Sequence, residues 1–250
     1  MKTLGIVGGL GPESTIDYYR SIIAVYQKRV ADGSYPHILI DSLDVDHGRR
    51  LIETDNLIGL ATYMVEAIRR LAAAGADFAL LSANSPHIVF DDVLSQSPLP
   101  LISIVETACT EVQRRGLKRV SLIGTRFTMS GRFYPEVFGR YGIALVPPSE
   151  EEQAYIHDKY INELVKGVFL PETRTRLESI IAEQVERDAV QAVILAGTEL
   201  TLILRGSSVA GVPLLDTAQI HVQAAVTEML SPGTSERRGG ISAEFPRTLR

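Results

Sequence analysis

The chain has 250 residues, 45% of them hydrophobic and 22% charged, which predicts a globular protein with a sizeable core. Its formal charge of −5 and the lack of a long basic run argue against nucleic-acid binding. No apolar run approaches the roughly 18 to 20 residues that cross a bilayer, and the amino terminus lacks a signal-peptide pattern, so we expect a cytoplasmic protein with no membrane partner. The single cysteine excludes an internal disulfide and a multi-cysteine metal site.

The predicted elements alternate between strands and helices along the chain. The expected strands cover residues 3–9, 37–43, 77–82, 100–105, 119–124, 143–146, 191–197 and 212–216. The expected helices begin at Pro12 and after Pro86, and cover 56–75, 105–115, 130–141, 151–167, 172–188, 199–205 and 217–230. This alternation predicts an α/β fold of doubly wound parallel sheets covered on both faces.

The second half of the chain repeats features of the first half. The segment 5-GIVGGLGPESTIDYY-19 resembles 121-SLIGTRFTMSGRFYP-135, and 80-LLSANS-85 resembles 193-VILAGT-198. The repeat predicts two similar α/β halves, and we expect a first domain formed by residues 1–100 and 207–230 and a second formed by residues 101–206. The alternative explanation is that all strand-to-helix turns look alike. Residues 231–250 lack periodicity and are expected to form a flexible tail.

Four strand-end loops carry the polar residues of a candidate site. Ligands bind outside the carboxyl ends of parallel strands, so we expect the loops to meet in a cleft between the domains. The loop 8-GGLGPEST-15 exposes backbone amides at a helix start. The other loops supply Asn84, Ser85, His87, Thr125, Thr128, Thr198 and Glu199. Neutral donors and helix amino ends suit a small dicarboxylate or an amino acid, whereas helix capping and a tight turn are the alternative roles.

The motifs GIVGGLGPEST, ANSPHIVFDD, IGTRFTMSGRFYPEVF and LAGTEL resemble, in this order, those of the aspartate/glutamate racemase family, which works without pyridoxal phosphate. The resemblance runs from about residue 1 to residue 230 and includes 162-NELVKG-167 and 215-LDTAQIH-221. It implies two pseudo-symmetric α/β domains with the substrate in the cleft between them, no cofactor, and a homodimer.

The resemblance also implies a mechanism that this chain does not carry. Two cysteines of the family face each other across the substrate α-carbon, where one thiolate removes the α-proton and the other thiol returns it on the opposite face. The matching positions here are Ala83 and Gly197, which hold no transferable proton. The only cysteine, Cys109, shares a helical face with Val105 and Val112 and is expected to be a buried structural thiol. We therefore predict that two-thiol racemisation does not occur.

The ligand-binding positions of the family carry over residue by residue. They are Gly8, Gly9, Asn84, Ser85, Thr125, Thr128, Thr198 and, by its place next to Thr198, Glu199. Some family members bind a distal carboxylate with an arginine and a lysine. The candidates for these two roles are Arg49 or Arg50 in 46-DHGRRL-51, and Lys166. An exposed cation at a helix start is the alternative role of either arginine.

Two functions remain open at this stage. The first is an isomerase- or lyase-type enzyme that moves a proton at a carboxylate-bearing carbon, with Glu199 as the preferred acid or base because it stands beside the vacated second thiol position. The other candidate proton carriers are Ser82, His87, Asp46 and His47. The second function is a non-catalytic relative that binds a small carboxylate, or regulates in response to it, after losing the chemistry.

Overall fold

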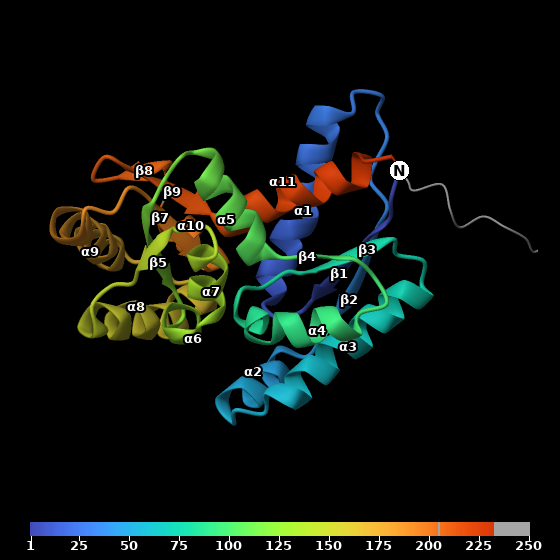
Figure 1. Cartoon of the computed structure of the whole chain (residues 1–250), viewed down its shortest axis with the longest axis horizontal. Helices are drawn as coiled ribbons and strands as arrows, with labels where there is room; N and C mark the ends of the chain where they lie inside the picture. The colour runs from blue at the N-terminus through green and yellow to red at the C-terminus, as the bar shows by residue number, and fades with distance from the viewer. Residues whose placement is uncertain (205, 233–250) are drawn as a thin grey trace, which may run out of the picture.

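Two sheets of mainly parallel strands, each covered by helices on both faces, make up the fold (Figure 1). The computed structural model describes residues 1–204 and 206–232. Of the predicted flexible tail, residues 233–250 lie outside the described residues. The predicted α/β class with two doubly wound domains is confirmed.

The first sheet is fully parallel and has the strand order β2-β1-β3-β4. Its strands are β1 (Leu4–Gly8), β2 (Ile38–Ser42), β3 (Phe78–Leu81) and β4 (Leu101–Ile102). Helices α1 (Pro12–Arg29) and α11 (Thr217–Leu230) bury Leu4 and Ile6 on one face. Helices α3 (Leu57–Ala73) and α4 (Phe90–Gln96) bury Val7 on the other face. Burial on both faces explains why β1 reads as a continuous apolar run.

The second sheet has the order β6-β5-β7-β9-β8. Its strands are β5 (Arg119–Gly124), β6 (Ala144–Val146), β7 (Val193–Ala196), β8 (Ser208–Val209) and β9 (Val212–Asp216). Helices α5 (Ile104–Arg114) and α7 (Phe133–Gly139) cover Val120 and Leu122 on one face. Helices α8 (Glu150–Asn162), α9 (Pro171–Asp188) and α10 (Thr198–Ile203) cover Ile123 on the other face.

Short elements account for the differences from the predicted pattern. Helix α2 (Val45–Glu53) and the two-residue strand β8, which pairs antiparallel with β9, were not predicted. The predicted helix 130–141 is preceded by a separate turn of helix, α6 (Arg126–Ser130). The predicted helix 151–167 ends early and continues as the 3₁₀ helix η2 (Leu164–Lys166). The segment after Pro86 begins as the 3₁₀ helix η1 (Ser85–Val89).

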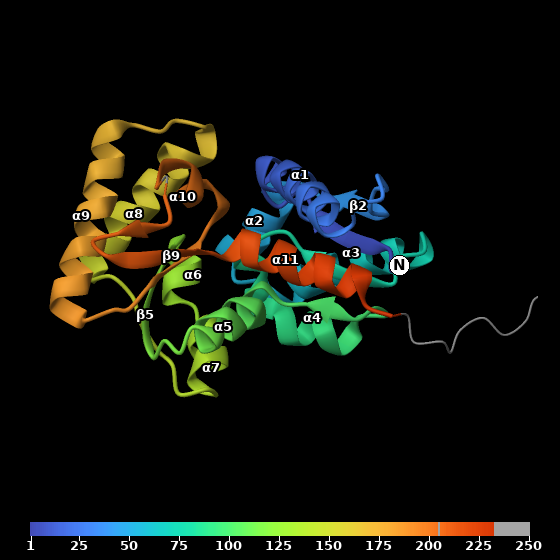
Figure 2. The ribbon, with the colours of Figure 1, turned by 90° about the horizontal axis from the view of Figure 1, so that it is seen from above.

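The chain crosses between the two sheets at places that differ from the predicted domain boundaries. We expected strand 212–216 in the first domain, but β9 pairs with β7 of the second sheet. We expected residues 101–105 of the strand 100–105 in the second domain, but β4 pairs with β3 of the first sheet. Strand pairing joins residues far apart in sequence, so the sequence of a strand does not show which strand it pairs with. Figures 1 and 2 show α11 returning from the second sheet to lie beside α1.

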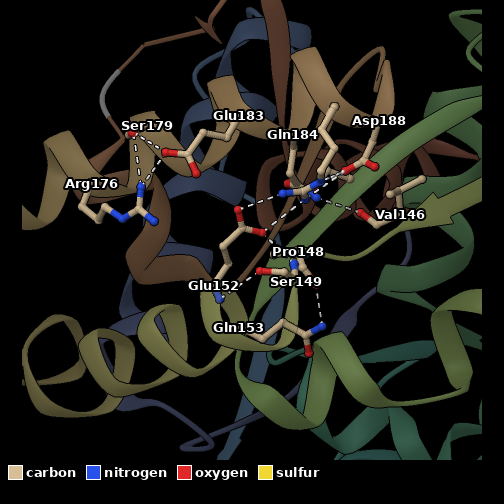
Figure 3. Close-up of polar contacts among 12 residues, drawn as sticks. Val146, Pro148, Ser149, Glu152, Gln153, Arg176, Ser179, Glu183, Gln184 and Asp188 are labelled. Carbon is tan, nitrogen blue, oxygen red and sulfur yellow. Dashed lines mark hydrogen bonds and ion pairs between the residues drawn. The ribbon is translucent and has the colours of Figure 1, made fainter.

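A polar cluster fixes the amino end of α8 against α9 (Figure 3). Ser149 and Glu152 form a capping box, in which each side chain bonds the other residue's backbone amide. The guanidinium of Arg187, on α9, donates to both carboxylate oxygens of Glu152 at 3.2 and 3.3 Å. These contacts hold the first turn of α8 against α9.

Two further expectations concern burial and membranes. Cys109 is 1% exposed and packs among the apolar residues of α5, so the predicted buried thiol is confirmed. Within residues 1–204 and 206–232, no helix is long and apolar enough to cross a membrane.

Candidate active site

A cavity of about 440 Å³ lies between the two domains, at the carboxyl ends of their parallel strands. All four predicted loops contribute to its wall. The loop after β1 supplies Leu10 and Gly11, and the loop after β3 supplies residues 82–86. The loop after β5 supplies Thr125 and the loop after β7 supplies residues 197–199. The four loops therefore lie around one cavity, as the sequence predicted.

The structure separates the predicted site residues into two groups. The residues that line the cavity are Ala83, Asn84, Ser85, Thr125, Gly197, Thr198 and Glu199, together with Arg49 and Ser82. The residues that lie outside its wall are Gly8, Gly9, Thr128 and Lys166, together with Asp46, His47, Arg50 and His87.

Gly8 and Gly9 allow close backbone packing. A Cβ atom on Gly9 would lie 2.2 Å from the carbonyl oxygen of Leu43, and the φ angle of Gly9 is +77°. Its amide donates to the hydroxyl of Thr15 at 2.9 Å. A Cβ atom on Gly8 would lie 2.6 Å from Cγ2 of Thr15. Both glycines were predicted to contact the ligand, but their conformations and contacts are accounted for by the turn between β1 and α1.

Thr128 and Lys166 also lie away from the cavity. The buried hydroxyl of Thr128 is 3.2 Å from the hydroxyl of Thr125, so Thr128 acts on the cavity wall through its neighbour. Lys166 is exposed at the end of η2, and the residue before it, Val165, lines the cavity. The early end of α8 explains this difference, because the side-chain directions of a continuous helix do not apply to η2.

Asn84 uses its side chain to hold the two domains together. Its Oδ1 atom accepts a hydrogen bond from the hydroxyl of Tyr134 at 2.7 Å, and its Nδ2 atom donates to the hydroxyl of Thr217 at 3.3 Å. Asn84 is buried and makes no side-chain cap on η1. Beside it, the hydroxyls of Ser85 and Thr125 are 3.4 Å apart and join the domains at the cavity. Asn84 is thus committed to the protein, whereas Ser85 and Thr125 are part-buried and face the cavity.

His87 is a buried neutral residue that fixes the loop after β3. Because a carbonyl only accepts, Nδ1–H donates to the carbonyl of Ala83 at 3.0 Å, and Nε2 accepts from the amide of Ile104 at 3.3 Å. Burial, aided by the nearby His221, lowers the pKa of His87 to about 3. Both ring nitrogens are used away from the cavity. The structure therefore supports a structural role for His87 and not a role as a proton carrier.

The remaining candidate proton carriers differ in access to the cavity. Ser82 lines it, but its hydroxyl donates to the carbonyl of Val7 at 3.2 Å and lies 3.4 Å from the hydroxyl of Thr15, and neither group is a base. Asp46 pairs with Arg49 at 3.2 Å on exposed α2. His47 packs edge-on against Tyr63. None of these groups forms an activated acid or base in the cavity.

The side of the cavity near Gly197 carries the carboxylate of Glu199. The Oε2 atom of Glu199 accepts hydrogen bonds from the hydroxyl of Thr198, at 2.8 Å, and from the hydroxyl of Tyr160. Tyr160 comes from α8 and lines the cavity beside Gly197. Burial, followed by the charge of Glu199, raises the pKa of Tyr160 well above its ordinary value, so the phenol is protonated and donates. The sequence analysis did not find Tyr160.

Among the helices whose first turns line the cavity, α1, η1 and α10 have no side-chain cap. Gly11 and Gly197 are the N-cap residues of α1 and α10 and have no side chain that could cap, and Asn84 does not cap η1. Thr125 caps α6. Uncapped first-turn amides carry partial positive charge, which favours an anion. The cavity is therefore suited to a carboxylate.

The rest of the wall is largely apolar and comes in part from α2. Its apolar members are Leu10, Val45, Ile52, Leu60, Phe127, Ile161 and Val165. Arg49 lies in this wall, but its guanidinium donates to Glu53 at 2.8 and 2.9 Å. No three His, Cys, Asp or Glu side chains come together as metal ligands in the part of the chain that the structure describes.

The comparisons with known proteins agree with this arrangement. The model of the Asp/Glu/Hydantoin racemase family matches residues 7–225. The chain is 23% identical over 235 residues to the broad specificity amino-acid racemase RacX of Bacillus subtilis (strain 168), covering 91% of this chain and 98% of that one.

Two solved structures have closely similar folds. A proposed Asp/Glu racemase of Yersinia pestis has a TM-score of 0.86 at 29% identity, covering 92% of this chain and 100% of that one. An aspartate racemase homologue from Pyrococcus horikoshii OT3 has a TM-score of 0.81 at 30% identity, covering 92% and 99%. With its two parallel sheets and the family model matched over most of its length, the chain belongs to the Asp/Glu/Hydantoin racemase family.

Proposed function

We propose that the chain is an isomerase- or lyase-type enzyme that binds a small amino acid between its domains and moves a proton at the α-carbon without thiols. The observation that carries this proposal is the kind of residue that stands at the two positions after β3 and β7. Ala83 and Gly197 line the cavity from opposite domains and hold no proton, whereas the carboxylate of Glu199 lines the same cavity. Chemistry at an α-carbon needs a group that accepts its proton, and Glu199 is the candidate base.

The helix starts around the cavity support binding of the substrate carboxylate. The uncapped amides of α1, η1 and α10 supply partial positive charge, and the hydroxyls of Ser85 and Thr125 supply donors beside them. Because these donors are neutral, the carboxylate is held without a fixed cation that would bind phosphate more tightly.

The apolar wall supports an apolar side chain on the substrate. Val45, Ile52 and Phe127 would pack against such a side chain and release water from it. A dicarboxylate is the second candidate, favoured by Arg49 in the same wall. Since Arg49 is already bonded to Glu53 and Asp46, a distal carboxylate would have to compete with both acidic partners.

Exchange of the α-proton in D₂O tests the proposal. The protein is incubated with L-leucine, L-methionine, L-aspartate or L-glutamate, the α-proton signal is followed by ¹H NMR, and enantiomers are separated by chiral chromatography. We expect exchange of the apolar acids without formation of the D-enantiomer, since Ala83, which lines the cavity from the other domain, has no group that could return a proton. Glu199→Gln should lower the exchange rate by about 100-fold or more.

The matched control is Glu186→Gln, which changes an exposed glutamate on α9 and should leave the rate unchanged. Formation of the D-enantiomer would contradict the proposal that protons are transferred on only one face of the α-carbon. Binding of the four acids with no exchange by the unmodified protein would instead support the non-catalytic carboxylate-binding alternative.

A further inference from the structure

Tyr160 explains why residue 197 has no side chain. The φ angle of Gly197 is −172°, an extended conformation that any residue adopts, so its backbone does not require glycine. A Cβ atom at this position would lie 2.5 Å from Cε2, 2.6 Å from the hydroxyl oxygen and 2.9 Å from Cζ of Tyr160. The aromatic ring and its hydroxyl therefore fill the space into which a side chain at position 197 would project.

The hydroxyl of Tyr160 is part of a hydrogen-bonded group in the cavity wall. It donates to Oε2 of Glu199, which also accepts from Thr198, and all three residues line the cavity. Tyr160 is 7% exposed and packs among the apolar residues beneath α8. A buried phenol next to a carboxylate stays protonated, so this hydroxyl gives up its proton only as it gains another one.

We propose that Tyr160 and Glu199 replace the second thiol as a proton relay acting on one face of the bound substrate. The inference rests on the proposed function and adds Tyr160 as the catalytic residue that touches the reacting carbon. The phenol oxygen forms a new O–H bond with the α-proton while the original phenolic proton moves to Oε2 of Glu199. The C–H electron pair stays on the α-carbon, Tyr160 remains neutral, and Glu199 becomes a carboxylic acid.

The reverse transfer returns a proton, or a deuteron from solvent, to the same face. Ala83 lines the cavity from the other domain and offers only a methyl group, so this position supplies no acid that could complete an inversion. The relay thus predicts exchange with retained configuration and requires no cofactor.

Tyr160→Phe tests the relay, because it removes the hydroxyl and keeps the ring that packs against Gly197. With L-leucine or L-methionine in D₂O, we expect the exchange rate to fall by about 100-fold or more, with little change in the substrate concentration that gives half the maximal rate. Tyr155→Phe, on the same helix but outside the cavity wall, should leave the rate unchanged. A rate within about twofold of wild type for Tyr160→Phe overturns the relay even if Glu199→Gln is inactive. If the unmodified protein exchanges none of the four acids, the proposed function fails as well.

A second experiment needs no substrate and tests whether the Tyr160 ring fills the space beside Gly197. Gly197→Ala should lower the Tm by about 5 °C, because the new methyl group collides with the Tyr160 ring. In a Tyr160→Leu background the same substitution should cause almost no further loss. A Gly197→Ala protein that melts like the wild type would show that Tyr160 does not fill this space, which overturns the replacement.

Discussion

At the residue scale, the polar side chains near the cavity are shared between ligand-facing and structural roles. The sequence predicted Asn84 and Ser85 as equal carboxylate donors. Asn84 is instead bonded to Tyr134 and Thr217, which stand 50 and 133 positions away, so no local pattern could reveal these partners. Tyr160 was missed for the same reason. The one local signal was Gly197 itself, a glycine at a strand end where its backbone does not need one.

Asn84→Ala should lower the free energy of unfolding by about 2 kcal/mol, because the fully buried hydroxyl of Tyr134 loses the amide oxygen to which it donates at 2.7 Å. Adding Tyr134→Phe removes that hydroxyl, so the double variant should be more stable than the sum of the two single changes predicts. Urea unfolding measures all three proteins. Tyr141→Phe, at an exposed tyrosine, is the control and should change stability by less than about 0.5 kcal/mol. Additive effects of Asn84 and Tyr134 would contradict the coupling.

At the element scale, most strands and helices could be predicted because burial on both faces of each sheet leaves a clear apolar pattern. Helix α2 was missed although Val45 and Ile52 have helical spacing. Gly48 lies between them and weakens the helical pattern of the sequence. A Cβ atom there would approach Leu10 to 3.2 Å, so the glycine lets α2 pack closely against Leu10. Strand β8 has two residues, too few to show any period.

Ser149→Ala should destabilise the protein by about 1 kcal/mol, since it removes the side-chain half of the α8 capping box. The expected fall in Tm is about 3 °C, measured by thermal melts followed by circular dichroism. Ser130→Ala is the control, because its exposed hydroxyl makes only a 3.4 Å contact with Gln153. Since α8 carries Tyr160 to the cavity, the same variant should also reduce α-proton exchange. An unchanged Tm would show that the capping box does not anchor α8.

At the scale of the whole molecule, the two sheets share one strand order, with β1, β2, β3 and β4 matching β5, β6, β7 and β9. The sequence repeat predicted this likeness but misplaced the crossings. Each crossing leads from the last parallel strand of one sheet directly into a capped helix of the other domain, with Ser103 capping α5 and Asp216 capping α11. Local sequence shows the caps, but only pairing across the sheets shows to which domain each strand belongs.

Two buried histidines bond the chain where it crosses from β4 of the first sheet to α5 of the second domain. Nε2–H of His221 donates to the carbonyl of Ile102 at 3.0 Å while its Nδ1 accepts from Tyr18 at 2.9 Å, and His87 accepts the amide of Ile104. Burial lowers the pKa of His221 to about 4, and burial with the nearby His221 lowers that of His87 to about 3. Both rings are therefore neutral in the folded protein over a range in which the unfolded chain takes up protons.

These pKa values predict a loss of stability in mild acid. An unfolded histidine titrates near pH 6.5, so the stabilisation is complete above that pH and is lost as the pH falls toward the folded values. Below about pH 5.5 the free energy of unfolding should drop by about 1.4 kcal/mol per pH unit for each histidine. Urea unfolding from about pH 7 to about pH 4.5 measures the slope. His221→Gln removes one of these titrations and should lower the slope; an unchanged slope in that variant would show that His221 is not one of the groups that weaken the crossing.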